Sequence, residues 1–116
     1  MSRKRRSGAA AHRRAPAPVF AALGDETRLA LVAKLSSGEP RSISQLTRGS
    51  RLTRQAITKH LRVLERVEVV RSVRAGRESL FELNPEPIEE IKQYLARVSE
   101  LWDRKLARLK LLVEGN

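Results

Sequence analysis

A long amphipathic segment at the C-terminal end of the chain constrains the fold more than any other feature. Asn84-Pro-Glu-Pro can begin a helix, because proline and acidic side chains are both favourable in a first turn. The pattern then runs to about Val113, and a helix of roughly 27 residues exceeds the usual length in a small globule. Its apolar residues recur every three or four positions, with Lys105 at the one heptad position that is not apolar. The heptad residues are Ile88, Ile91, Leu95, Val98, Trp102, Leu109 and Leu112.

This stripe is longer than the rest of the chain could cover. Leu101, Leu106 and Val113 widen it further. Packing on its own domain is the alternative, but the preceding domain is small and the stripe continues along most of the helix. We therefore expect the helix to pair with a second copy, which makes the protein a homodimer. We interpret Trp102, which belongs to this stripe, as a residue that packs in a core and not as part of a cage around a ligand.

A second amphipathic helix is predicted from Thr53, a good N-cap residue. Ile57, Leu61 and Leu64 lie at i, i+4 and i+7 and form one buried stripe. The opposite face contains no acidic and no large apolar side chain; it comprises Gln55, Lys59, Arg62 and Arg66, with Thr58 at its edge. A shorter helix with Leu46, capped by Ser42 or Ser44 and closed near Gly49, precedes it. Two helices joined by a short turn predict a helix-turn-helix.

The periodicity changes to that of strands after this helix. Residues 69–74 and 78–83 contain β-branched and aromatic residues, and Arg74-Ala-Gly-Arg77 between them predicts a tight turn. At the other end, residues 19–23 predict a short helix, Asp25 caps the next one, and Ser36-Ser-Gly38 ends it. Glu39-Pro-Arg41 is expected to be a linker.

The expected fold is therefore mainly α with a small β-hairpin, a dimeric winged helix-turn-helix of order α-α-α-α-β-β-α. Residues 19–116 form one domain that ends in a dimerisation helix over about 86–113. Residues 1–18 are expected to be a disordered basic arm, either a DNA-contacting arm or a solubilising tail.

The net charge of +11 is concentrated in two segments. Residues 1–18 and 41–83 each carry a net charge of +6, whereas residues 84–116 are neutral. A concentrated positive field favours a polyanion, and double-stranded DNA is the expected partner. RNA is less favoured, because aromatic stacking platforms are missing from the predicted DNA-facing surface.

Other classes of protein find little support in the residues. There is no cysteine and there are only two histidines, His12 and His60, so neither thiol chemistry nor a metal-ligand cluster is expected. No nucleophile elbow or phosphate loop is present, and we expect neither an enzyme nor a cofactor. No apolar run is long enough to span a membrane and no signal peptide is visible. The expected location is the cytoplasm, at the nucleoid.

Three segments resemble one family of regulators. They are Phe20-Ala-Ala-Leu-Gly-Asp-Glu-Thr-Arg-Leu-Ala-Leu31, Leu52-Thr-Arg-Gln-Ala-Ile-Thr-Lys-His-Leu-Arg-Val-Leu-Glu65, and Val70-Arg-Ser-Val-Arg-Ala-Gly-Arg-Glu-Ser-Leu-Phe-Glu-Leu83. Together with the order of elements, they are similar to the ArsR/SmtB family of winged helix-turn-helix repressors. The resemblance implies a homodimer that binds an operator and blocks transcription, with the first helix, including Phe20, and the last helix at the dimer interface.

The family's two kinds of metal site are not expected. One kind uses cysteines near the third helix, and the other uses histidine and carboxylates on the last helix, where residues 84–116 contain no histidine. The sequence therefore resembles the metal-independent branch, and no inducer is assigned. One position also departs from the family, which has a small residue and a glycine after the recognition helix. Val67-Glu-Val69 stands there, so Glu68 would be strained if it were left-handed, by roughly 1–2 kcal/mol.

The resemblance and the charge pattern together give a set of DNA contacts. Gln55 suits adenine, Arg54 suits guanine, and Thr58 suits a thymine methyl. Lys59 could reach guanine or phosphate. The remaining residues are expected to hold phosphates or, at the wing, which is the predicted hairpin of residues 69–83, the minor groove. The full set is Arg51, Thr53, Arg54, Gln55, Thr58, Lys59, His60, Arg62, Arg74 and Arg77. His60 lies at the flank of the buried stripe, so a structural role is a strong alternative for it.

A competing function remains open at this stage. The long helix could be the functional element of a protein-interaction module that binds nucleic acid only non-specifically. The basic residues gathered on one side favour the regulator, because an interaction module has no need of them.

Overall fold

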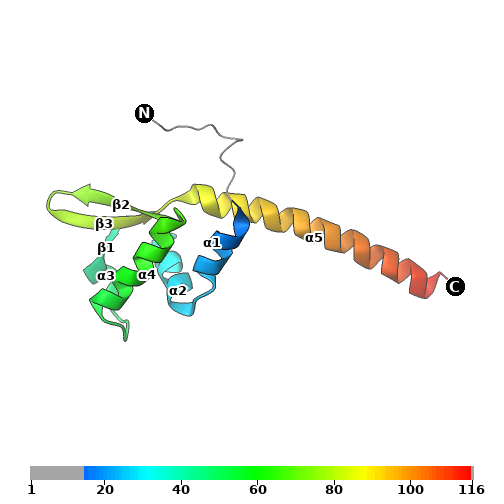
Figure 1. The fold of residues 1–116 in the computed structure, drawn as a ribbon, viewed down its shortest axis with the longest axis horizontal. Helices are drawn as coiled ribbons and strands as arrows, with labels where there is room; N and C mark the ends of the chain where they lie inside the picture. Colours follow the sequence, from blue (N-terminus) through cyan, green and yellow to red (C-terminus); the bar gives the residue numbers. More distant parts are fainter. Residues whose placement is uncertain (1–14, 116) are drawn as a thin grey trace, which may run out of the picture.

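The computed structural model describes residues 15–115, which form five helices and a three-stranded sheet, with the hairpin of residues 70–83 at one end of the molecule and the long last helix at the other (Figure 1). The elements in chain order are α1 (Pro16–Leu23), α2 (Glu26–Leu35), β1 (Arg41–Ser42), α3 (Ile43–Thr47), α4 (Arg54–Arg66), β2 (Val70–Ala75), β3 (Glu78–Leu83) and α5 (Pro85–Glu114). This confirms the predicted mainly helical, winged helix-turn-helix fold.

The first helix begins earlier than the sequence predicted. α1 starts at Pro16 and not at Val19, because proline at the first helical position lacks only an N–H that would be unpaired there anyway. Residues 16–18 therefore belong to the folded domain. The rest of the predicted basic arm, residues 1–14, lies outside the described residues.

Side-chain caps set the starts of the next helices. The Asp25 carboxylate accepts from the backbone N–H of Arg28 at 3.0 Å and begins α2, as predicted. Of the two candidate serines, Ser42 caps α3: its hydroxyl accepts from the N–H of Gln45 at 3.1 Å, and the Gln45 side chain accepts from the N–H of Ser42 at 2.8 Å. This reciprocal capping box stabilises a helix of only five residues.

The sheet contains one strand that the sequence analysis missed. β1 pairs antiparallel with β3, with Arg41 opposite Phe81, so the sheet order is β1-β3-β2. The expected linker is thus partly a strand, and two residues are too few to show a strand period. The hairpin itself is as predicted. Gly76 has φ of 64° and begins a two-residue loop between Ala75 and Glu78.

The end of α4 resolves the question raised by Val67-Glu-Val69. Glu68 has φ of 67°, so it does adopt the left-handed conformation. The N–H of Glu68 donates to the carbonyl of Glu65, and the N–H of Val69 donates to that of Leu64. These two bonds form a Schellman motif, which brings Val69 into the core beside Leu64. A helix-ending conformation that usually requires glycine is therefore adopted here by a glutamate.

The core lies between α4, the inner side of the sheet and the first three helices. The predicted stripe Ile57, Leu61 and Leu64 is completely buried in it. Phe81 of β3 and Leu46 of α3 pack into the same cluster. A single core of this kind orients α4 against both the helices and the wing.

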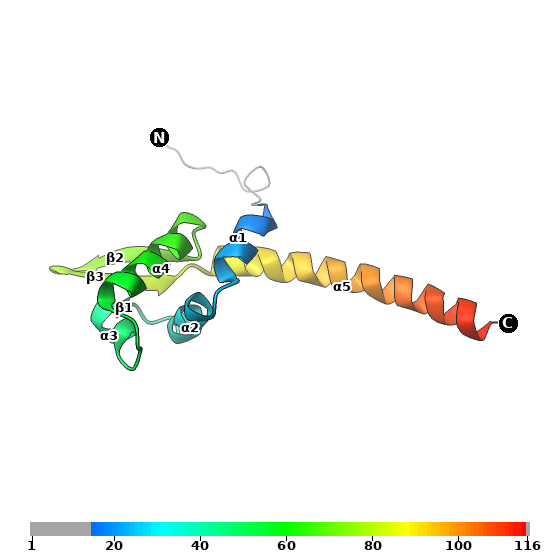
Figure 2. The same cartoon turned by 60° about the horizontal axis from the view of Figure 1, so that its bottom comes forward.

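Most of α5 leaves this body. Only its first turns contribute to the core, through Pro87, Ile88 and Ile91. From residue 92 to residue 115, every side chain except that of Val98 is exposed. At 30 residues the helix is about 45 Å long, and it extends from the body as an arm (Figures 1 and 2). The Cα radius of gyration is 18.8 Å, well above the roughly 13 Å of a compact domain of 100 residues.

Candidate nucleic-acid interface

The exposed side of α4 is the centre of the candidate interface. The Thr53 hydroxyl accepts from the N–H of Ala56 at 3.1 Å and begins the helix. Because Ile57, Leu61 and Leu64 all face the core, a helical period places Gln55 and Lys59 on the outer side, where both are exposed.

Four of the predicted contact residues come together at a shallow depression between α3 and α4. They are Arg54, Gln55, Thr58 and Lys59, and Ile43 forms the opposite edge. The Thr58 hydroxyl donates to the carbonyl of Arg54 at 2.8 Å, so its proton is used within the helix and its oxygen is left as an acceptor. The depression thus combines an amide, two cations and a methyl group, which is the chemistry used to read base edges.

Arg51 and Thr53 lie just before this surface, in the turn between α3 and α4, and both are exposed. Thr53 uses its hydroxyl oxygen as the helix cap. Within residues 15–115, Arg51, Arg54 and Lys59 form no ion pair, so their charges are not cancelled by neighbouring carboxylates.

Arg62 is more constrained than the sequence suggested. Its guanidinium donates to Glu65 at 2.8 Å and lies 5.9 Å from the centre of the Phe81 ring. The bond from Arg62, together with one from the Ser72 hydroxyl at 2.9 Å, holds the pKa of the Glu65 carboxyl below its usual value. Arg62 therefore connects α4 to the wing, and a phosphate would have to share it with Glu65.

The wing carries the other predicted cations. Arg74 and Arg77 lie on either side of Gly76 at the hairpin tip, and both are exposed. Arg71, further down β2, is paired with Glu82 on the neighbouring strand at 2.8 Å. The tip therefore presents two cations that have no ion pair in the described part of the chain.

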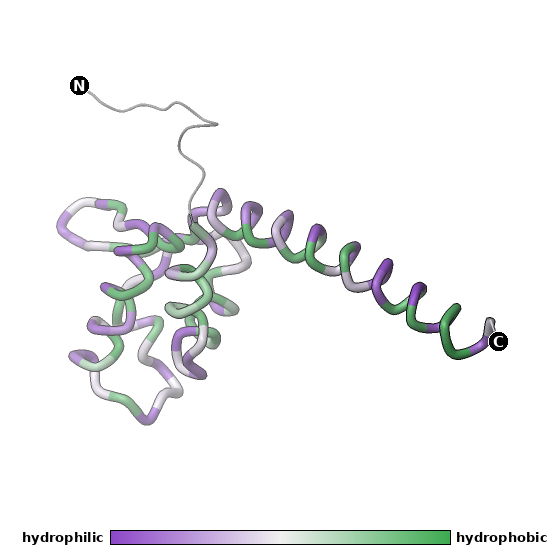
Figure 3. The backbone as a smooth tube through the Cα atoms, turned by 45° about the vertical axis from the view of Figure 1, so that its right-hand side comes forward, coloured by the Kyte–Doolittle hydropathy of each residue, from purple (hydrophilic) through white to green (hydrophobic). Residues whose placement is uncertain are grey.

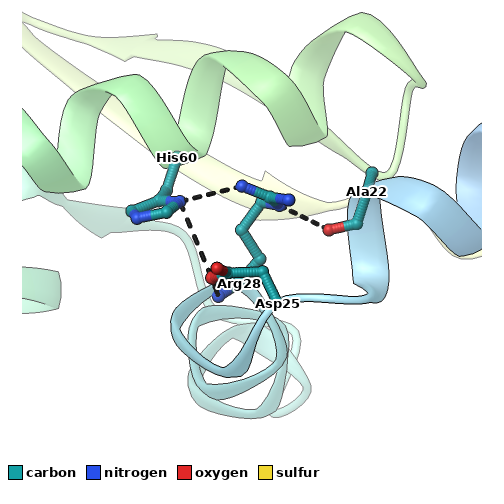
Figure 4. Close-up of polar contacts among 4 residues, drawn as sticks. All are labelled: Ala22, Asp25, Arg28 and His60. Carbon is teal, nitrogen blue, oxygen red and sulfur yellow. Dashed lines mark hydrogen bonds and ion pairs between the residues drawn. The ribbon is translucent and has the colours of Figure 1, made fainter.

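His60 does not lie with these residues. Its Nδ1 atom is 3.0 Å from a guanidinium nitrogen of Arg28 and 3.8 Å from the Asp25 carboxylate, at the packing of α4 against α2 (Figure 4). The geometry favours the structural alternative for His60. Sequence reasoning missed the partner Arg28, because no pattern along the chain links residues 32 positions apart.

Across residues 15–115, no three histidine, aspartate or glutamate side chains gather as potential metal ligands. In the same part of the chain, no helix has the length and apolar character needed to cross a membrane.

Comparison with known proteins identifies this arrangement. A family model described as a helix-turn-helix domain matches residues 23–73. The HTH-type transcriptional regulator Rv2034 of Mycobacterium tuberculosis is 31% identical over 102 residues, which cover 88% of this chain and 92% of that protein. An ArsR-like transcriptional regulator from Rhodococcus sp. RHA1 is 37% identical, with a TM-score of 0.74 over 87% of this chain and 94% of that one. The chain belongs to the ArsR family of winged helix-turn-helix transcriptional regulators.

Membership in the ArsR family makes the protein a transcriptional regulator with a helix-turn-helix DNA-binding domain. The same fold is found at lower identity, 21%, in the homodimeric winged helix-turn-helix domain of Mb0332 from Mycobacterium bovis. That structure has a TM-score of 0.56, and the match covers 79% of this chain and 82% of that one.

The residues expected at an ArsR-type dimer interface fall into three groups. Ile91 is only 8% exposed and belongs to the core of its own chain. Phe20 is half-buried, with its ring centre 6.0 Å from that of Tyr94 on α5. Val98 is half-buried as well, whereas the others along α5 are exposed by half or more: Leu95, Trp102, Leu109 and Leu112.

Proposed function

We propose that the protein is a repressor that binds an inverted-repeat operator as a homodimer and is independent of metal. The observation that carries the proposal is the depression on α4, where Arg54, Gln55, Thr58 and Lys59 gather without a carboxylate. This chemistry suits the major groove of DNA, and the face of α4 that carries it is exposed.

In this proposal α4 lies in the major groove with its N-terminal turns nearest the bases. Gln55 would pair with adenine and Arg54 with guanine, each through two hydrogen bonds. The methyl group of Thr58 would contact a thymine methyl. Lys59, one turn after Gln55, would reach a guanine or a phosphate.

Other cations would hold the backbone and set the register without reading sequence. Arg51 lies before the recognition helix, and Arg62 lies within it, about two turns after Gln55 on the same face. Arg74 and Arg77 at the wing tip would contact phosphate or the minor groove beside the site. Because part of Arg62 is bonded to Glu65, we expect its contribution to be smaller than that of Arg51.

The exposed face of α5 supports the homodimer. Trp102 is 58% exposed and Leu109 is 56% exposed, and on a helical projection they share one side with Leu95 and Val113. Figure 3 shows hydrophobic residues recurring along the lower side of α5, and this side continues well beyond the part of the helix that the body covers. An apolar face this long on a single chain marks an interaction site. A second copy accounts for it, since equal arms can cover each other about a two-fold axis.

Such a dimer carries two copies of α4 related by two-fold symmetry. The operator is therefore expected to be an inverted repeat with half-sites about one helical turn, or ~10 bp, apart. A dimer bound there would block transcription by occupying the promoter, which is the role the family resemblance implies.

The decisive experiment is selection of randomised duplex DNA on the purified full chain at near-physiological salt, followed by sequencing of the bound pool. Salt must be held near physiological values because a chain of charge +11 will bind any DNA in dilute buffer. An inverted repeat is the expected result. Enrichment of no sequence, with binding lost as salt rises, would instead favour the interaction module.

Two variants test the reading surface. Gln55→Ala combined with Lys59→Ala should abolish preference for the selected duplex while leaving helix content and dimer unchanged. The matched control is Lys92→Ala combined with Gln93→Ala, an exposed pair on α5 with the same residue types. Unchanged affinity in the first pair would show that α4 does not read the bases.

A second pair tests the interface. Trp102→Glu should give monomers in sedimentation equilibrium, because a carboxylate would be buried on the apolar seam. Ala107→Glu adds the same charge on the opposite, exposed side of α5 and should leave the dimer intact. A dimer that survives Trp102→Glu would place the interface elsewhere.

A further inference from the structure

Arg28 makes contacts that the proposed DNA-binding surface does not use. It lies in the first turns of α2 and is half-buried. Its Nε donates to the carbonyl of Ala22, in the last turn of α1, and one terminal nitrogen lies 3.0 Å from Nδ1 of His60, in the middle of α4. One side chain therefore joins three helices (Figure 4).

The chemistry of this contact defines the state of His60. A guanidinium can only donate, so Nδ1 of His60 must be the acceptor. This contact corresponds to the tautomer with its ring proton on Nε2, which points away from Arg28 in Figure 4. His60 thus holds Arg28 through an atom that a protonated ring could not offer.

Neighbouring groups stabilise the positive charge of the Arg28 side chain. The Ala22 carbonyl belongs to the C-terminal end of α1, where the helix dipole favours a cation. The Asp25 carboxylate, which caps α2, lies 3.8 Å from the same His60 nitrogen and balances the guanidinium charge. The hydrogen bond that Asp25 accepts from the backbone N–H of Arg28, together with the positive charge of the Arg28 side chain, lowers the pKa of the Asp25 carboxyl, which favours its ionised form beside the arginine.

The helices α1 and α4, which Arg28 connects, have different roles. α1 packs against α5 through Phe20 and Tyr94, beside the arm that we assign to the dimer. α4 carries the proposed reading residues, and His60 lies one residue after Lys59. We propose that Arg28 is a positioning residue that fixes the recognition helix relative to the dimer interface. In this proposal His60 holds Arg28 in place, and this role takes the place of the DNA contact that the sequence predicted for His60.

This inference rests on the proposed function, because it concerns the spacing of two recognition helices in a dimer. If Arg28 sets the angle between α1 and α4, losing it allows each α4 to tilt. Binding to the selected inverted repeat should then weaken, and discrimination against repeats lengthened or shortened by 1 bp should fall, whereas non-specific phosphate contacts should be retained.

Three substitutions at His60 separate positioning from direct contact with DNA. His60→Asn keeps an acceptor at the place of Nδ1, His60→Gln places its polar group near Nε2, and His60→Leu keeps neither. Arg28→Lys, which retains the charge but not the forked donors, tests the same bond from the other side. All are made in the full chain and are compared by affinity for the selected duplex.

We expect His60→Leu, His60→Gln and Arg28→Lys each to bind the selected duplex about tenfold more weakly, the effect of one lost hydrogen bond to a charged group. His60→Asn should recover most of the affinity lost in His60→Leu. Sedimentation should show a dimer in every case. The reverse pattern, with His60→Gln active and His60→Asn inactive, would overturn the proposal, because it would mean that Nε2 touches the DNA.

A measurement without DNA separates this inference from the proposed function. Amide hydrogen exchange over residues 57–64 of α4 should be faster in Arg28→Lys and His60→Leu than in the wild type and His60→Asn. If the wild type selects no operator but exchange differs in this way, the repressor proposal fails and the positioning role stands. Equal exchange in all four proteins would overturn the positioning role, whatever the DNA results.

Discussion

The left-handed glutamate after the recognition helix offers the sharpest test of how stability is distributed in this fold. Glu68 has φ of 67°, and its backbone closes α4 through the Schellman motif. Its carbonyl also accepts from the Asn84 side chain at 3.0 Å, so the conformation is held from two sides. We predict that Glu68→Gly stabilises the protein, although glycine usually weakens one.

The magnitude follows from two opposing terms. A residue with a Cβ atom in this conformation costs roughly 1–2 kcal/mol, and glycine removes that cost. Glycine also gives the unfolded chain more freedom, which costs about 0.5–1 kcal/mol. The net gain is therefore centred on about 0.75 kcal/mol, within a range of about 0 to 1.5 kcal/mol. Both bonds of the motif and the bond from Asn84 use backbone atoms of residue 68, so the substitution leaves them in place.

The assay is urea unfolding at a fixed protein concentration, because the proposed dimer would make stability depend on concentration. A gain of this size should raise the urea midpoint by about 0.3–0.7 M for a typical slope. Glu68→Ala is the matched control: it removes the same carboxylate with whatever that carboxylate contacts but keeps the Cβ atom, so Glu68→Gly should be the more stable of the two variants.

Two results would refute the reasoning. If Glu68→Ala stabilised as much as Glu68→Gly, the effect would come from loss of the carboxylate and not from backbone strain. If Glu68→Gly lowered the midpoint, the glutamate would be making contacts worth more than the strain it bears.

Three other predictions concern the cap, the wing and pH. Ser42→Ala should destabilise the protein by about 1 kcal/mol in the same urea assay, since it removes half of the capping box that begins α3, whereas Ser44→Ala, at the neighbouring exposed position, should have little effect. Arg77→Ala should weaken binding to all duplexes alike and reduce the slope of log affinity against log salt by about 0.9 per lost phosphate contact; an unchanged slope would mean that the wing tip does not touch phosphate. Because the folded state lowers the pKa of Glu65, its contribution to stability is complete above the unfolded pKa, near 4, and is lost as the pH falls through the folded value. Urea midpoints at pH 7 and pH 3 should therefore differ less in Glu65→Gln than in the wild type, and an equal difference would remove Glu65 as a source of acid sensitivity.

Most elements of the fold are determined by residues that lie close together in the sequence. Ile57, Leu61 and Leu64 define the buried side of α4 by their spacing alone, and they thereby define the opposite side that carries Gln55 and Lys59. Asp25 and Thr53 cap their helices with their own side chains. Gly76 begins the hairpin loop. These features depend on neighbours within four residues, so a single sequence is enough to predict them.

The tertiary structure decided the features that join distant parts of the chain. β1 exists only because β3 lies beside it, and two residues carry no period of their own. Ile91 and Trp102 belong to the same heptad stripe of α5, yet the body of the protein covers Ile91 and leaves Trp102 exposed. His60 is set apart from its neighbours on α4 by its contacts with Arg28, 32 residues earlier, and with Asp25. Local spacing determines which side of an element is apolar, but only the packing of elements determines what that side meets.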